Sequence, residues 1–134
     1  MSSKGRPYRR VLVDGFAVLV GRGDEENDHL TFDVAEPEDF WLHVGGGTAG
    51  SHVVVRNPEK LAVLPRAVLE RAAALAAWHS KARAARRVDV HVCRVSDVSK
   101  ARGAPAGEVT LRRWQRVRVA PAPVVDGEST DPSG

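Results

Sequence analysis

Residues 39–57 (DFWLHVGGGTAGSHVVVRN) restrict the fold more than any other stretch, because they hold two short apolar runs joined by a glycine-rich loop. Side chains alternate between the two faces of a strand, so the pattern predicts two strands that each have two distinct faces. The faces are Phe40, Leu42 and Val44 against Trp41 and His43, and Val53 and Val55 against His52, Val54 and Arg56. Such runs around a glycine-rich loop are typical of a β-hairpin. The loop either packs tightly on its own domain or receives a ligand, since glycine permits positive φ and close backbone approach.

The size and composition of the chain favour a single soluble domain. A length of 134 residues fits one domain, and 43% hydrophobic residues are enough for a core. No apolar run approaches the ~20 residues that a membrane span needs, so no membrane partner is expected. The chain has one cysteine, Cys93, so no internal disulfide can form. This composition predicts a cytoplasmic protein.

Charge is unevenly distributed along the chain. Every Asp, Glu, Lys or Arg between Asp24 and Asp39 is acidic, whereas residues 81–118 hold eleven Lys or Arg and three acidic residues. A basic second half favours a polyanion such as RNA or DNA as partner, and the alternative is an ordinary solvated surface.

The order of patterns along the chain predicts an α+β fold, with a mostly antiparallel sheet, one long helix packed on a face and a short acidic helix. Strands are expected at 10–14, 16–21, 40–44, 52–55, 88–98, 108–111 and 114–120, with a bulge near Cys93 and Arg94. Helices are expected at 25–32, capped by Asp24, and at 65–86. We divide the chain into a flexible basic arm (1–9), a domain (10–120) and a disordered tail (121–134).

Two patterns bear on chemistry. Asp39, His43 and His52 lie near one another in the hairpin and raise the alternative of a small metal-dependent hydrolase, although two histidines on short strands are weak evidence for a metal site. In the last strand Arg112, Trp114, Arg116 and Arg118 alternate with Arg113, Gln115, Val117 and Val119. Cations beside an aromatic ring on an open sheet face suit phosphate pairing and base stacking with RNA. The alternative is that Trp114 covers a core edge.

Several motifs, taken in order, resemble the RNA-binding domain of NFACT proteins over about residues 14–120. The matching segments are Val20-Gly21-Arg22, Asn27-Asp28-His29-Leu30-Thr31, Asp39-Phe40-Trp41-Leu42-His43, Gly50-Ser51-His52-Val53-Val54, Ala72 to Ser80-Lys81, Val88 to Val92, Ser99-Lys100 and Pro105-Ala106-Gly107-Glu108-Val109. In the family this module belongs to ribosome-quality-control factors that recruit tRNA to stalled large ribosomal subunits. The chain departs from the family at Gly45-Gly46-Gly47-Thr48, which replaces a more polar loop, and at Lys100-Ala101-Arg102, which thins a lysine pair.

The resemblance implies a non-enzymatic, cytoplasmic RNA-binding module without a cofactor or metal, in the form of a free-standing single-domain member. Its expected partners are structured RNA, either tRNA or rRNA, and the ribosome. The candidate RNA contacts are Arg22, Trp41, His43, Ser51, His52, Lys81, Lys100, Arg102, Trp114 and Arg116. The motif matches suggest the first eight, and the basic stripe of the last strand suggests the other two. A third alternative is a protein-interaction module that uses the acidic 24–39 segment and the face of Trp41. The RNA hypothesis requires the hairpin and the last strand to present polar side chains on one open surface.

Overall fold

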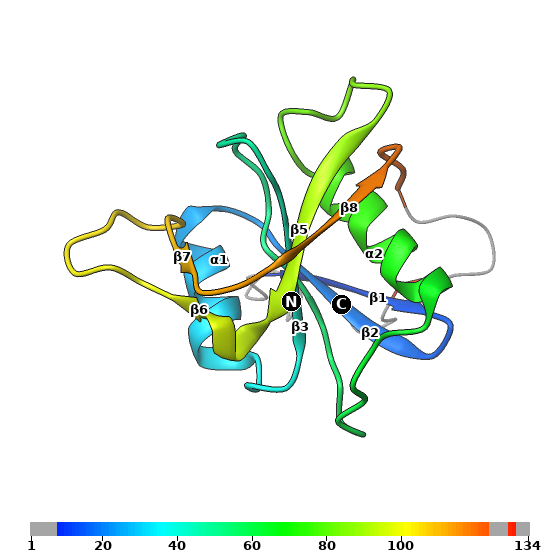
Figure 1. The fold of residues 1–134 in the computed structure, drawn as a ribbon, viewed down its shortest axis with the longest axis horizontal. Helices are drawn as coiled ribbons and strands as arrows, with labels where there is room; N and C mark the ends of the chain where they lie inside the picture. The colour runs from blue at the N-terminus through cyan, green and yellow to red at the C-terminus, as the bar shows by residue number, and fades with distance from the viewer. Residues whose placement is uncertain (1–7, 124–128, 131–134) are drawn as a thin grey trace, which may run out of the picture.

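A seven-stranded antiparallel sheet organises the chain, which the computed structural model describes at residues 8–123 and 129–130 (Figure 1). Its strands are β1 (Tyr8–Val13), β2 (Phe16–Gly21), β3 (Phe40–Val44), β4 (Val53–Val55), β5 (Val88–Arg94), β8 (Gln115–Val119) and β9 (Ser129–Thr130). The order across the sheet is β8-β5-β3-β4-β2-β1-β9. The predicted α+β class is confirmed.

Two predicted hairpins are present. Asp14 and Gly15 join β1 to β2 with φ values of 50° and 85°, which fits the tight turn that an Asp-Gly pair favours. In the second hairpin Trp41 of β3 lies opposite Val54 of β4, and Leu42 opposite Val53. This register places Phe40, Leu42 and Val44 on one face and Trp41 with His43 on the other, as the alternation predicts.

One face of the sheet packs against α2 (Arg66–Trp78), which lies to the right of the sheet in Figure 1. The helix buries Val68, Ala72 and Leu75 against the valines of the sheet. Small alanine side chains let the helix approach closely, and burial of this kind contributes about 25 cal/mol per Å² of apolar surface. This apolar core between α2 and the sheet stabilises the packing of the helix on the sheet.

The long helix ends at Trp78, so the predicted extension to residue 86 is wrong. Instead of continuing the helix, Ser80 forms a bridge with Gly50 of the glycine loop. The amide of Ser51 donates to His79 at 2.9 Å, and the amide of Lys81 donates to Ala49 at 2.9 Å. A Cβ on residue 50 would lie 2.7 Å from Cβ of Ser80, so the close approach requires glycine there. The loop therefore packs on its own domain and terminates the helix.

The second face of the sheet is covered as well. A helical segment, α1 (Asp24–His29) continued by the π-helical turn η2 (Leu30–Val34), lies there beside the short pair β6 (Val98–Ser99) and β7 (Thr110–Leu111), to the left in Figure 1. This second core buries Leu19, Leu30, Trp41, Val54, Cys93, Val95 and Val98. The sheet beneath Trp41 is therefore closed and not an open platform.

Three local predictions need correction. The predicted strand 88–98 ends at Arg94 and turns through a 3₁₀ segment, η3 (Val95–Asp97), so the change of register comes from a helical turn and not from a bulge. The predicted strand 108–111 is reduced to β7. Asp24 is the first residue of α1, and Gly23 holds the capping position.

The predicted arm (1–9) and tail (121–134) lie mostly outside the described residues. Tyr8 and Arg9 already belong to β1, and Ser129–Thr130 form β9 beside β1. No helix in the described ranges combines the length and the apolar character needed to cross a membrane.

Candidate nucleic-acid interface

His52 connects three separate segments on the covered face of the sheet. Its Nδ1 lies 2.8 Å from the Thr31 hydroxyl, and its Nε2 lies 3.2 Å from the carbonyl oxygen of Gly107. Its backbone amide donates to the side-chain oxygen of Asn27 at 3.0 Å. The Trp41 indole N–H donates to the same Thr31 oxygen at 3.2 Å. Trp41 and His52 are 2% and 1% exposed, so these two rings form the floor of the region and not its surface.

His43 is half-buried beside the rings of Trp41 and His52, on the same face of the sheet. Its ring centroid lies 5.5 Å from that of His52 and 5.8 Å from that of Trp41. Its Nε2 lies 3.2 Å from the carbonyl oxygen of Gly50. The expected approach of His43 and His52 across the hairpin is confirmed. His91 of β5 lies opposite His43 in the register, and it extends the row of rings to the strand that carries Trp114.

An aromatic hollow of about 530 Å³ opens above these rings. Its walls are the glycine loop 45–50, the segment 106–109, His91 and Trp114. His91 and Trp114 lie with ring centroids 5.3 Å apart, tilted by 33°. Among its lining residues are two carboxylates, Asp24 and Glu108, and no Lys or Arg.

A second, basic hollow of about 390 Å³ adjoins the first, because Asp24, Ala49 and Gly50 line both. Its cations are Arg9, Arg22, Lys81 and Arg83. The Arg83 guanidinium lies 4.4 Å from the centroid of the Trp78 ring and donates to the Trp78 carbonyl. Within residues 8–123 and 129–130, none of these four cations forms an ion pair with a carboxylate. Because Asp24 also lines this hollow, its lining carries four positive charges against one carboxylate and is net positive.

The histidines around the two hollows favour the neutral form. Burial lowers the pKa of His52 to about 4, and the nearby His43 acts in the same direction. Burial also lowers the pKa of His43 and of His91. For His79, in the basic hollow, burial and then the charges of Arg9 and Arg83 lower the pKa. The aromatic hollow is therefore neutral on its ring side near pH 7, whereas the basic hollow is cationic.

Lys100 fastens the segment that covers the aromatic hollow. Its ammonium lies 3.1 Å from the Asp28 carboxylate and donates to the carbonyl oxygens of Pro105 and Glu108. Asp28 also accepts from the amide of Gly107 at 3.2 Å. We call residues 100–109 the cover segment. Lys100 is thus engaged inside the domain, whereas Arg102, on the same segment, is exposed.

The remaining candidates divide between the two hollows and their rims. Arg22, Ser51 and Lys81 meet at the basic hollow, where the Ser51 hydroxyl donates to the carbonyl of Gly21 at 2.7 Å. Trp114 is 50% exposed at the rim of the aromatic hollow, and exposed Arg116 lies opposite His91 in the register. The other two arginines of the predicted stripe are paired, Arg112 with Asp97 and Arg118 with Asp89. The stripe therefore contributes fewer free cations than its sequence indicates.

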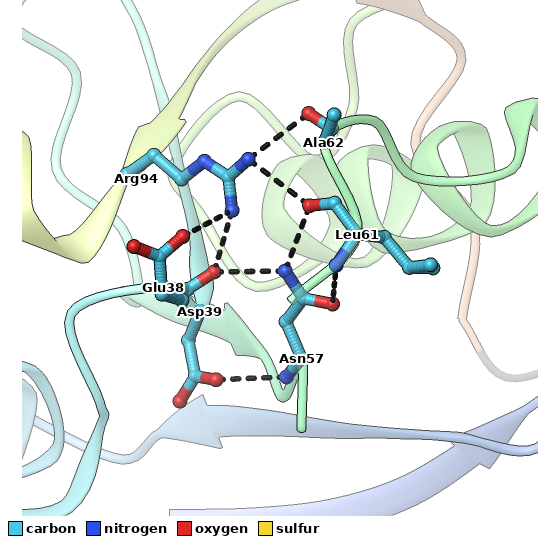
Figure 2. A network of polar contacts seen from close by, with 6 residues as sticks. All are labelled: Glu38, Asp39, Asn57, Leu61, Ala62 and Arg94. Atoms are coloured by element: carbon cyan, nitrogen blue, oxygen red, sulfur yellow. Dashed lines mark hydrogen bonds and ion pairs between the residues drawn. The ribbon is translucent and has the colours of Figure 1, made fainter. Parts of the chain in front are cut away.

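Asp39, part of the hydrolase alternative, belongs to a different structural network. Its carboxylate accepts from the amides of Asn57 at 2.7 Å and Glu36 at 2.9 Å and pairs with Arg56 at 2.9 Å. Figure 2 shows the surrounding contacts, in which Arg94 donates to Glu38, Leu61 and Ala62. Among the described residues, no group of three or more His, Cys, Asp or Glu side chains could hold a metal ion. Asp39 therefore bonds to the segments around the start of β3 and does not form a metal site with His43 and His52.

Sequence reasoning missed several residues of this region. Asn27 and Thr31 lie in one of the motifs that carry the resemblance, but the sequence indicates no role for either residue. His91 carries a usable signal, because it falls between Val90 and Val92 and must face away from the core around α2. Arg83 lies two residues after Lys81 in the sequence, whereas Arg9 carries no local signal, since only the tertiary fold brings it to Lys81.

Comparison with known proteins identifies the family of the chain. The family model for the NFACT protein RNA binding domain matches residues 7–113. The Rqc2 homolog RqcH of Bacillus subtilis (strain 168) is 35% identical over 123 residues, which cover 88% of this chain and 21% of that protein. The Rqc2 homolog RqcH of Streptococcus suis (strain 05ZYH33) is 35% identical over 120 residues, or 87% of this chain and 20% of that protein.

A solved structure is also similar. It is the C-terminal part of the fibronectin/fibrinogen-binding protein of Streptococcus suis, with a TM-score of 0.78 and 35% identity over 87% of this chain and 46% of that one. The chain belongs to the NFACT RNA-binding domain family. It spans about a fifth of the length of the curated relatives that it matches.

Proposed function

We propose that this chain binds structured RNA, tRNA or rRNA, through the surface that contains the basic and aromatic hollows. The observation that carries the proposal is the group of four cations, Arg9, Arg22, Lys81 and Arg83, around one hollow without carboxylate partners in the described ranges. Phosphate groups are the ligands that such a cluster suits, because pairing with them releases condensed counterions. Family membership supports the same ligand class.

The candidate contacts take two kinds of role in this proposal. Exposed Arg22, Lys81, Arg102 and Arg116 pair with phosphates, and Trp114 offers a ring for stacking. Trp41, His43, Ser51, His52 and Lys100 act from beneath through hydrogen bonds. His43 bonds to Gly50 of the glycine loop, and His52 and Lys100 bond to the cover segment. Ser51 bonds to Gly21, and Trp41 bonds to Thr31.

The relatives named as Rqc2 homologs suggest the setting. We place the chain in the cytoplasm, in translation or ribosome quality control, with the ribosome as an assembly partner. It acts there as a non-enzymatic binding module.

Filter binding to a tRNA at two salt concentrations tests the proposal. If the four cations neutralise four phosphates, affinity falls about 50- to 150-fold between about 50 and 200 mM salt. The variant Arg22→Glu/Lys81→Glu should bind at least about 10-fold more weakly and show a shallower salt dependence.

The matched control is Lys60→Glu/Arg66→Glu, which makes the same change in net charge far from the hollows. Lys60 and Arg66 are exposed beyond β4 and at the start of α2. The control should keep the affinity of the wild type. Binding that is absent at low salt, or equally weakened in both variants, contradicts the proposal.

A protein-binding role is the second candidate, because an apolar groove adjoins the aromatic hollow at Trp114. Phe40, Val63, Leu69 and Trp114 line this groove of about 450 Å³, and Val63 is 73% exposed. Pull-down after nuclease treatment separates the candidates. Partners retained by the wild type and lost with Val63→Asp favour the groove, and partners released by nuclease favour RNA.

A further inference from the structure

The two adjoining hollows differ in charge, and the difference indicates which part of a nucleic acid each one accepts. Of the two hollows, the basic one is lined by four Lys or Arg and by Asp24, whereas the described residues that line the aromatic one include Asp24, Glu108 and neutral rings but no Lys or Arg. A phosphate in the aromatic hollow would lie near Asp24 and Glu108 without a cation to offset the repulsion. An uncharged, planar group that donates hydrogen bonds fits there instead.

We infer that the aromatic hollow binds one unpaired nucleobase with its ribose, while the adjoining basic hollow holds the flanking phosphates. This inference rests on the RNA binding proposed above and adds the form of RNA that is recognised. The rim pair of Trp114 and His91, with centroids 5.3 Å apart, supplies the stacking surface. The carboxylates of Asp24 and Glu108 accept from exocyclic amino groups or from the ribose 2′-hydroxyl.

The size and enclosure of the hollow support a single base. A volume of about 530 Å³ accommodates a nucleoside and lies in the usual range of small-ligand sites. The glycine loop and the cover segment wall it on two sides, so a base that remains paired and stacked in a duplex cannot enter. A bulged or looped base can be splayed out without that cost.

The glycine loop is shaped for this arrangement. A Cβ on residue 45 would lie 2.5 Å from Nε2 of His91, so glycine at this position lets the imidazole ring lie against the loop backbone. The same loop contributes Gly50 to both hollows. A nucleotide that crosses the loop can therefore place its base on one side and its phosphate on the other.

Two RNA hairpins test the inference directly. They share one stem and differ only at a one-nucleotide bulge, which carries adenine in the first and is abasic in the second. The wild type should bind the adenine hairpin about 5- to 100-fold more tightly, the range expected for one stacked base. Trp114→Ala and His91→Ala should remove that preference and leave affinity for the abasic hairpin within about 2-fold of the wild type.

The charge variant and an aromatic control complete the design. Arg22→Glu/Lys81→Glu should weaken binding to both hairpins by the same factor and keep the preference for adenine. Phe32→Ala removes an aromatic side chain that is 40% exposed elsewhere, and it should change neither affinity. Circular dichroism confirms that each variant is folded.

The outcomes separate this inference from the function on which it rests. Tight, salt-dependent binding that is equal for the two hairpins overturns the nucleobase site and leaves RNA binding intact. Absence of binding to both hairpins at low salt overturns the RNA function and the inference together. As an independent readout, adenosine 5′-monophosphate should shift the indole N–H resonance of Trp114, which is the one missing from the spectrum of Trp114→Ala. An unmoved Trp114 resonance at saturating nucleotide contradicts the site.

Discussion

The hydroxyl of Thr31 lies 2.8 Å from Nδ1 of His52, and the same oxygen accepts the indole N–H of Trp41 at 3.2 Å. The Thr31 side chain on η2 is thus the hydrogen-bond partner of two buried rings on the sheet, those of Trp41 and His52. Because Thr31 accepts from Trp41, its own proton is available to His52, whose Nε2–H then donates to Gly107. The order of donors fixes the His52 tautomer and connects the helix, the sheet and the cover segment.

Thr31→Val is expected to destabilise the domain by about 1–3 kcal/mol, because it keeps the volume and leaves two buried polar groups unpaired. Urea denaturation measures the change. Thr110→Val, at an exposed position of β7, is the matched control and should change stability by less than about 0.5 kcal/mol. Equal effects at the two positions would show that the shared hydroxyl contributes nothing.

Stability should fall as the pH is lowered from 7.5 to 5.5. His52 has a folded-state pKa of about 4, below the value of about 6.5 in the unfolded chain. Its contribution is therefore complete above pH 6.5 and is lost as the pH falls towards 4, with about 1 kcal/mol lost by pH 5.5. Burial lowers the pKa of His43 and His91 too, so they act in the same direction.

Urea midpoints between pH 7.5 and 5.5 measure this loss. A wild-type midpoint independent of pH over this range would contradict a neutral, buried His52.

Asp39→Ala should destabilise the domain by about 2–4 kcal/mol. Asp39 is 2% exposed, and its loss removes the acceptor for the amides of Asn57 and Glu36 and leaves Arg56 without its partner. Thermal unfolding measures the effect, with exposed Asp33→Ala as control. Addition of zinc to the wild type should leave the transition unchanged, and a raised transition would revive the metal site at Asp39, His43 and His52.

Lys100→Met is expected to loosen the cover segment more than it weakens electrostatic contact with RNA. The variant removes the ion pair with Asp28 and two hydrogen bonds to the segment's own carbonyls. Hydrogen exchange of the amides in residues 103–109 should become at least about 10-fold faster. Arg102→Met, on the same segment but exposed, should leave the exchange unchanged. If these amides stay protected from exchange in Lys100→Met, the hydrogen bond from the Gly107 amide to Asp28 is sufficient to hold the segment.

The sequence predicted the sheet, both hairpins and the covered face at α2, because alternation and turn residues act over a few positions. It could not predict that α2 stops at Trp78, since the competing partner of Ser80 is Gly50, 30 residues earlier. The expectation that Trp41 lies on an open face is wrong for the same reason, because residues distant in the sequence cover it. Alternation reveals that two faces exist, but a second layer built from residues 24–34 and 98–111 closes one of them.

The sequence predicted several residues of the candidate site but not how they lie relative to one another. Arg22, Ser51 and Lys81 do meet at one hollow, although nothing in their spacing indicates it. Lys100 and Arg102 look equivalent in the sequence, yet only the first lies within reach of Asp28. Ion pairs between residues far apart in the sequence decide which cations can contact a ligand. These pairs cannot be predicted from one sequence without the fold.

The contacts of His52 determine which segments of this domain can be replaced by those of a relative. His52 bonds to two motifs that lie far from it and from each other in the chain. Asn27 accepts from its backbone amide, whereas Thr31, of the same motif, and Gly107 bond to its imidazole. A chimera that imports the hairpin from another family member while retaining the native helix and cover segment would combine groups that were never selected together. Segment swaps in this family should therefore succeed when the three motifs travel as a set and lose solubility when one travels alone.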